Sequence, residues 1–190
     1  MTIEEVHQLI RTRRSVYPPQ YIEQEIPKAV LQKALENANC APTHKLTQPW
    51  RFRVMQGTAQ KRFGIFMSEK YRSITSLETF SIAKYEKLKM NPQKAGALIA
   101  ICMQRDPKGR VPEWEEVAAV AMAVQNIWLT LHAYGVGSYW STPDLLEYFG
   151  EFEPLEEGEQ CLGIFYAGYY NELPRGPKKE VAQSRVKWLD

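Results

Sequence analysis

The sequence predicts an α+β fold, in which helices and strands are mixed without strict alternation. Three patterns predict it. Apolar residues between Ile3 and Ile10 recur at helical spacing, so a first helix is expected over about 2–13. Residues 98–103, LIAICM, form a continuous apolar run, which is typical of a strand buried on both faces. The apolar run 117–124 opens a long helix that is apolar nearly all round.

The remaining elements follow from local signals. A second helix is expected to have Pro27 at its first position and to stop before 41–42. The segment WRFRVMQ alternates apolar and basic residues, which predicts a half-buried strand. Residues 58–92 predict one or two surface helices with a connection near 73–81. A strand in GVGSYW, a small helix capped by Thr142 with Pro143 at its first position, and a strand in LGIFYAGYY complete the fold.

Size and charge narrow the class of protein. A chain of 190 residues fits one domain, 1–190, with a polar C-terminal arm from about 171. The net charge of +2 does not by itself imply a nucleic-acid or membrane partner. With an acidic N-terminus and no long apolar run, the chain is expected to be cytoplasmic. The thiols of Cys40, Cys102 and Cys161 lie far apart in sequence, have no metal-ligand spacing and are expected to be buried and reduced.

Three segments could carry chemistry, and each has a structural alternative. RTRRS places Arg13, Arg14 and Ser15 at the end of the first helix, where they could grip an anion or only complement the helix dipole. APTHKLTQPW is a loop framed by prolines and rich in donors, or an ordinary connection. GVGSYWSTP could bring backbone close to a ligand, or simply join a helix to a strand. No dinucleotide fingerprint, P-loop or zinc motif is present.

In this order, the three segments resemble the nitroreductase family of FMN-dependent oxidoreductases. The family has RRS at the end of its first helix, then an A-P-x-x-x-x-x-Q-P-W-x-F loop and strand, matched here by residues 41–52. The resemblance extends over about residues 3–170. The histidine of APTHK and the segment VPEWEE are most similar to a small branch of NAD(P)H nitroreductases.

The resemblance implies a three-layer sandwich with a mixed, mostly antiparallel sheet flanked by helices. It also implies an intertwined homodimer with two FMN molecules at the interface, each held by both subunits. A second subunit would account for the all-round apolar helix at 117–131 and for the apolar end of the polar tail.

The resemblance also implies the cofactor-binding residues. Arg13, Arg14 and Ser15 would hold the FMN phosphate, ribityl chain and pyrimidine edge. The other subunit would contribute the loop after the second helix, and the segment after the long helix would pass behind the isoalloxazine. The complete set of predicted cofactor contacts is Arg13, Arg14, Ser15, Tyr17, Pro42, Thr43, His44, Gln48, Tyr139, Trp140, Ser141, Lys178 and Lys179.

Several residues depart from the family pattern. Tyr17 stands where many members have lysine or arginine, Leu46 where many have asparagine, and Ser141 where the nearest branch often has arginine. Lys178 and Lys179 are the nearest matches to a basic C-terminal residue that reaches the phosphate in many members. These departures bear on FMN affinity more than on the identity of the cofactor.

The implied function is a ping-pong reaction in which NAD(P)H reduces FMN and a nitroaromatic, quinone or related small acceptor then takes the electrons. No protein nucleophile and no metal are needed, and no catalytic side chain is assigned. His44 and Trp140 are expected to shape the pocket over the flavin. Two alternatives stay open: a flavoprotein of the same fold that dehalogenates or degrades flavin, and a module that binds an anion or nucleic acid through RTRRS and the C-terminal lysines.

Overall fold

The computed structural model describes residues 2–176 and 185–189. Its centre is a four-stranded sheet in the order β1-β2-β4-β3. The strands are β1 (Trp50–Met55), β2 (Ala97–Gln104), β3 (Val136–Ser141) and β4 (Glu159–Tyr169). All three neighbouring pairs are antiparallel, whereas a mixed sheet was expected. The reason is that strands of the same direction, β1 with β4 and β2 with β3, are not neighbours in this order.

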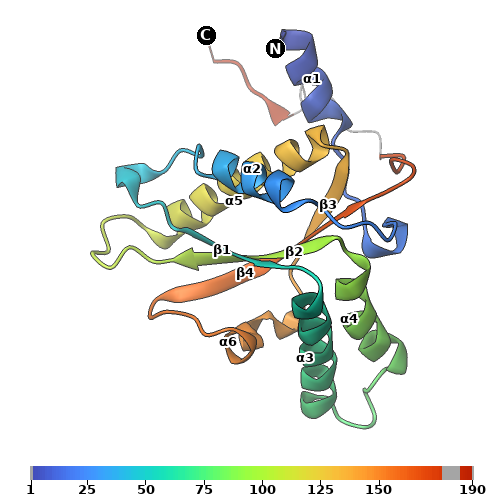
Figure 1. Cartoon of the computed structure of the whole chain (residues 1–190). Helices are drawn as coiled ribbons and strands as arrows, with labels where there is room; N and C mark the ends of the chain where they lie inside the picture. The colour runs from blue at the N-terminus through green and yellow to red at the C-terminus, as the bar shows by residue number, and fades with distance from the viewer. Residues whose placement is uncertain (1, 177–184, 190) are drawn as a thin grey trace.

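Helices cover both faces of the sheet, which gives the predicted three layers (Figure 1). One layer consists of α2 (Lys28–Ala38) and α5 (Glu113–Ala133). The other consists of α3 (Thr58–Ile74), α4 (Ile82–Lys94), the 3-10 turn η3 (Asp144–Tyr148) and α6 (Phe149–Phe152). The helix α1 (Ile3–Thr12) has no buried residue and leads into a short 3-10 turn, η1 (Pro18–Gln20). A further 3-10 turn, η2 (His44–Leu46), lies in the loop before β1.

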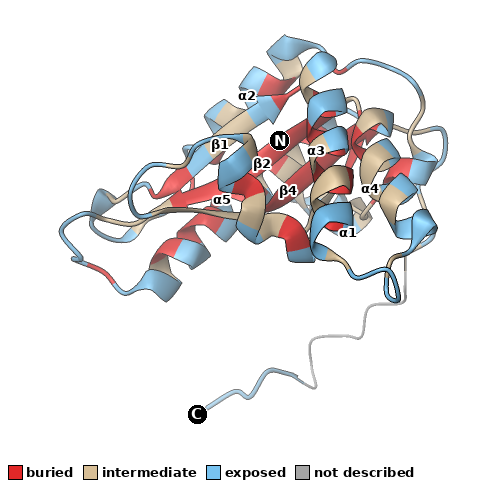
Figure 2. Ribbon diagram, turned by 90° about the horizontal axis from the view of Figure 1, so that it is seen from below, coloured by how far each residue is buried: buried red, intermediate tan, exposed pale blue. Residues whose placement is uncertain are grey.

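The central strand β2 separates two hydrophobic cores. Every residue from Ala97 to Met103 is 0% exposed, which confirms the strand predicted to be buried on both faces. Leu98, Ala100 and Cys102 pack into the core under α3 and α4. The alternate residues pack into the core under α2 and α5, as the period of two requires. In Figure 2, the strands of the sheet and parts of the helices that cover them are coloured as buried.

Two prolines lie one position earlier in their helices than the sequence suggested. Pro27 is the N-cap of α2, and Pro143 is the N-cap of η3, so Thr142 makes no cap. The fixed φ of proline suits the N-cap as well as the first helical position, and so the sequence signal is accurate only to one residue.

The helix α5 is not covered on every side within one chain. One face packs on the sheet, but Trp114, Val117 and Met122 are 69%, 37% and 40% exposed. The apolar C-terminal residues Trp188 and Leu189 are exposed too, so they do not dock on the body of their own chain. Within the described part of the chain, no helix combines the length and apolar character needed to cross a bilayer.

The loop between α2 and β1 is strained. Lys45, Leu46 and Gln48 have φ of 52°, 54° and 43°, the left-handed region that residues other than glycine and asparagine avoid. Side-chain contacts hold this conformation: Lys45 Nζ donates to the Arg110 carbonyl at 2.9 Å, and Gln48 N donates to Thr43 Oγ1 at 3.3 Å. Leu46 itself is 82% exposed, so no burial compensates for its conformation.

Replacing Leu46 with asparagine is therefore expected to stabilise the fold. Asparagine visits the left-handed region readily, and so Leu46→Asn should raise the free energy of unfolding by roughly 1 kcal/mol, measured by urea denaturation. The matched control is Leu77→Asn, because Leu77 is 97% exposed and is not among the residues with positive φ. An equal gain in both variants would contradict the assignment of strain to Leu46.

Candidate functional site

The RTRRS segment lies where α1 ends and the chain turns toward the sheet. The capping box between Thr2 and Glu5 starts α1, and Arg13 is its C-cap with an extended ψ of 130°. The Arg13 guanidinium lies over the Trp128 ring of α5, 4.4 Å from the ring centroid. Burial and the nearby Arg14 lower the pKa of Arg13. The segment therefore presents a partly desolvated cation, not only a solvated helix end.

Beyond Arg13, the chain runs alongside the edge strand β3. Ser15 forms an isolated parallel bridge with Ser138, and Val16 N donates to the Ser138 carbonyl at 3.1 Å. A Cβ at Gly137 would lie 2.6 Å from the Val16 Cβ, so glycine is required for this close approach. The glycine turn and the arginine segment thus build one region, although the bridged residues Ser15 and Ser138 are 123 positions apart in sequence.

Unpartnered buried polar atoms gather in this same region. Among the described residues, those with no hydrogen-bond partner are Arg13 Nη1, Trp128 Nε1, Ser138 Oγ and Glu116 Oε2. Glu116 Oε2 nevertheless lies 2.9 Å from Arg105 Nε in an ion pair, so it is compensated. The other three are two N–H donors and a hydroxyl around Arg13. Because a buried donor without an acceptor is costly, this arrangement fits a ligand rich in oxygen acceptors.

A histidine contact ties α1 to α5 beside the arginines. Thr12 Oγ1 and His132 Nε2 lie 2.9 Å apart. Burial, then Arg13 and Arg14, lower the pKa of His132, so the imidazole is held neutral. The positive charge of this region therefore comes from the arginines, and His132 contributes a hydrogen bond that links α5 to α1.

A cavity of about 760 Å³ opens on the opposite side of β3. Tyr17, Tyr139 and Ser141 line it, so the structure brings three of the predicted residues together. The Tyr17 and Tyr139 rings lie 4.8 Å apart between centroids, and Tyr139 stacks on Tyr166 at 5.0 Å. Burial raises the pKa of Tyr139 and of Tyr166, so both phenols stay protonated at neutral pH. The cavity thus has an aromatic wall suited to a planar ring.

The wall that faces these tyrosines was not predicted from the sequence. Lys84, Lys87 and Asn91 of α4 line the same cavity. Their spacing of three and four residues puts them on one helical face, a signal that the sequence does contain. What the sequence could not reveal is that α4 packs against η1 and so aims this face at the predicted site.

The loop 41–50 forms a separate part of the site at the other end of α5. Pro42, Thr43 and His44 line a shallow cavity of about 390 Å³ together with Trp114 and Met122. His44 Nδ1 lies 2.6 Å from Glu115 Oε2, in the first turn of α5.

This loop lies far from the arginine segment within one chain. Arg13 contacts Trp128, which lies 13 residues beyond Glu115 on α5, a separation of about 20 Å at the helical rise. Within one chain, these two groups of predicted residues do not meet.

The remaining predicted residues are placed elsewhere. Trp140 packs into the core under α5, because neighbouring residues of a strand point to opposite faces, and its Nε1 donates to the Leu162 carbonyl at 3.2 Å. Gln48 borders a third cavity next to Arg51 and Phe52. Lys178 and Lys179 lie outside the described residues.

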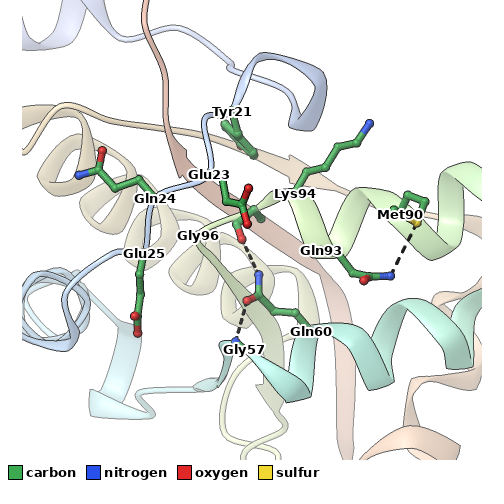
Figure 3. Close-up of a pocket in the computed structure, with 11 residues that line it drawn as sticks. Tyr21, Glu23, Gln24, Glu25, Gly57, Gln60, Met90, Gln93, Lys94 and Gly96 are labelled. Carbon is green, nitrogen blue, oxygen red and sulfur yellow. Dashed lines mark hydrogen bonds between the residues drawn. The ribbon is translucent and has the colours of Figure 1, made fainter.

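Another cavity, of about 510 Å³, holds none of the predicted residues (Figure 3). Its floor is Gln60, which is buried. Its Nε2 donates to the carbonyls of Ala95 at 2.8 Å and Pro92 at 3.0 Å, and its Oε1 accepts from Gly57 N at 2.8 Å. Glu23, Gln24 and Glu25 form the rim. The buried amide is thus satisfied by the backbone, and none of the described residues that line this cavity has a buried side-chain atom without a hydrogen-bond partner.

Comparisons with known proteins agree with this layout. A Bacillus subtilis protein named "Putative NAD(P)H nitroreductase YfhC" is 26% identical over 199 aligned positions, covering 96% of each chain. The crystal structure of a nitroreductase-like family protein from Bacillus cereus superposes with a TM-score of 0.84 at 25% identity, covering 100% of this chain and 98% of that one.

A more distant neighbour shares the fold. The FMN-dependent nitroreductase NfnB from Mycobacterium smegmatis, solved in complex with NADPH, has a TM-score of 0.75 at 15% identity and covers 98% of this chain and 99% of its own. The sequence itself matches the nitroreductase family over residues 10–169. That match takes in the arginine segment, the strained loop, α5 and β3, and this chain therefore belongs to the nitroreductase family.

Proposed function

We propose that this protein is an FMN-dependent NAD(P)H oxidoreductase that reduces nitroaromatic, quinone or related small acceptors. The observation that carries the proposal is the group of unpartnered donors around Arg13, namely its own Nη1, Trp128 Nε1 and Ser138 Oγ. Phosphate oxygens and the carbonyl edge of a flavin are acceptors of the kind that these donors lack. The family relatives that carry FMN or NADPH in their names support the same choice of ligands.

Bound FMN would supply the hydride-accepting ring, and the chain would supply position and charge. Arg13, Arg14 and Ser15 would hold the acceptor-rich parts of the cofactor. A guanidinium here also stabilises negative charge that develops on a nearby ring edge. Tyr17 and Tyr139 would pack on a flat apolar part of the cofactor or the substrate. Lys84 and Lys87 would add positive charge on the opposite wall of the cavity. No side chain in this arrangement needs to act as a nucleophile.

We further propose that the site is completed by a second copy of the chain. Exposed residues of α5 recur every three or four positions and form one stripe, Trp114, Val117, Ala118, Ala121, Met122 and Gln125. Two such stripes packed antiparallel would place the N-terminal end of one α5 beside the C-terminal end of the other. His44 of one subunit would then approach the arginine segment of its partner, which the separation of about 20 Å prevents within one chain.

The visible absorption spectrum of the purified protein tests the function. We expect the bands of oxidised flavin, present on purification or after adding FMN, and we expect them to bleach when NADPH or NADH is added without oxygen. Flavin bands that persist with both nucleotides would favour the alternative flavin chemistries. A protein that stays colourless in excess FMN would contradict the proposal.

Removal of the Arg13 charge should weaken FMN binding. Hydrogen bonds to a charged group contribute about 1.5–3 kcal/mol, so Arg13→Gln should raise the FMN Kd roughly 10- to 100-fold in a fluorescence titration. The control is Arg72→Gln, because Arg72 is an exposed residue of α3 that pairs with Glu69 and lies over the Tyr85 ring. An unchanged Kd in Arg13→Gln would mean that the unpartnered donors serve another ligand.

A charge on the exposed stripe of α5 should separate the subunits. Met122→Arg is expected to shift the protein from dimer to monomer by light scattering and to abolish FMN binding in the same samples. Ile65→Arg is the matched control, since Ile65 is also an apolar helical residue, 49% exposed on α3, against 40% for Met122. If Met122→Arg remains dimeric, the α5 stripe is not the contact between subunits.

A further inference from the structure

Two cysteines that lie 59 residues apart in sequence meet at the centre of the sheet. Cys102 on β2 is the register partner of Cys161 on β4. Arg51 on β1 is in turn the partner of Cys102, so a basic residue and the two thiols form a row across three strands. No local pattern predicts this row, because pairing between distant strands is a long-range property.

A β-bulge creates the pair. From Ala97 to Ile101, the partners on β4 descend one residue at a time, so an unbroken ladder would place Leu162 opposite Cys102. The register shifts between Ile101 and Cys102, Leu162 is left over, and Cys161 takes its place. The shift also turns Cys161 toward the core under α3 and α4, the face where Cys102 lies.

This placement suits a disulfide. Directly opposed residues of an antiparallel pair have Cα atoms about 4.5 or 5.5 Å apart. Disulfides accept Cα separations of about 4.4–6.8 Å, so the backbone need not move far to bridge the two. The two thiols also influence one another's pKa, as expected for side chains on the same face of paired strands.

The surroundings make the two thiols chemically unequal. Cys161 is half-buried, and its Sγ donates to the Gly163 carbonyl at 3.6 Å. The neighbouring Cys102 thiol and, more weakly, Arg53 lower the pKa of Cys161, whereas the Cys161 thiol and burial raise the pKa of Cys102. Arg53 is itself fixed by a bidentate ion pair with Glu159. Cys161 is thus the accessible nucleophile, and Cys102, fully buried behind it, is placed to resolve it.

We propose that Cys102 and Cys161 form a reversible redox pair that closes to a disulfide when the protein meets hydrogen peroxide. The Cys161 thiolate attacks one peroxide oxygen, the O–O bond breaks, and water leaves after protonation, which gives a sulfenic acid at Cys161. The Cys102 sulfur then attacks the Cys161 sulfur, the S–O bond breaks, and a second water leaves. Two thiols are oxidised and one peroxide is reduced to two waters. A dithiol reductant reverses the change.

The third cysteine provides an internal reference. Cys40 is exposed at the end of α2, and its sulfur has only a long 4.0 Å contact, to the Glu36 carbonyl. It has no thiol neighbour in the chain. Under the same oxidant, Cys40 should form sulfenic acid or an intermolecular bridge rather than an intramolecular disulfide.

The test uses the full-length protein with Cys40→Ser, in which only the pair remains. After treatment with hydrogen peroxide, thiols titrated in denaturant should fall from two per chain to none, and dithiothreitol should restore both. Peptide mapping without reductant should show the peptides of Cys102 and Cys161 joined within one chain. Both thiols surviving, or Cys161 appearing as sulfinic acid with Cys102 still reduced, would overturn the proposal.

Two further variants assign the roles. With Cys102→Ser added, Cys161 should accumulate as a sulfenic acid that dimedone traps. With Cys161→Ser added, oxidation of the buried Cys102 should slow at least about tenfold. Equal oxidation rates of Cys102 with and without Cys161 would contradict the assigned order. Because the peptide map of the Cys40→Ser protein needs neither variant, poor folding of one of them does not remove the test.

Discussion

The burial of β2 is the constraint on which the rest of the structure depends. A strand that exposes none of its residues from Ala97 to Met103 needs a paired strand on each edge and apolar cover on each face. The edges are taken by β1 and β4, and the faces by the α2–α5 and α3–α4 layers. The strand β3 joins this sheet at the outer edge of β4. The arginine segment and the aromatic cavity then lie on its two sides.

The distinguishing feature of the site is the positive charge of Arg13, part of which has no hydrogen-bond acceptor in the described chain. Surface arginines usually find carboxylates or water, but Arg13 lies over an indole with one N–H buried and unpaired. Such an arrangement is unfavourable in the isolated chain, and a bound anion or carbonyl would relieve it. The loop at residues 45–48 is also held in an unfavourable state, since contacts with the surrounding chain keep three of its residues in the left-handed region. Both features lie within motifs that the sequence analysis had singled out.

Local patterns in the sequence were sufficient for the elements and for most of the motifs. The buried strand expected at 98–103, the helix expected over about 2–13 and the one or two helices expected over 58–92 are confirmed, the last as two helices, because each depends on periodicity or on proline and glycine signals nearby. Relations between distant segments were not accessible. Whether Trp140 faces the tyrosine cavity depends on how β3 pairs, and the face of α4 that carries Lys87 depends on its packing against η1. The order β2-β4-β3, which removes the expected parallel pairing, is likewise a property of the whole fold.

The helix α5 has a consequence for how this protein can change over evolution. It carries the Glu115 contact of the strained loop near one end and the Trp128 contact of the arginine segment near the other. Inserting or deleting one residue between them would rotate one contact by roughly 100° relative to the other and move it by about 1.5 Å. Point substitutions can accumulate along α5 without this effect, but a change of length cannot be absorbed locally. The segment between the two contacts should therefore vary in composition while keeping its number of residues. Its length sets the distance between the two contacts and the angle between them around the helix axis.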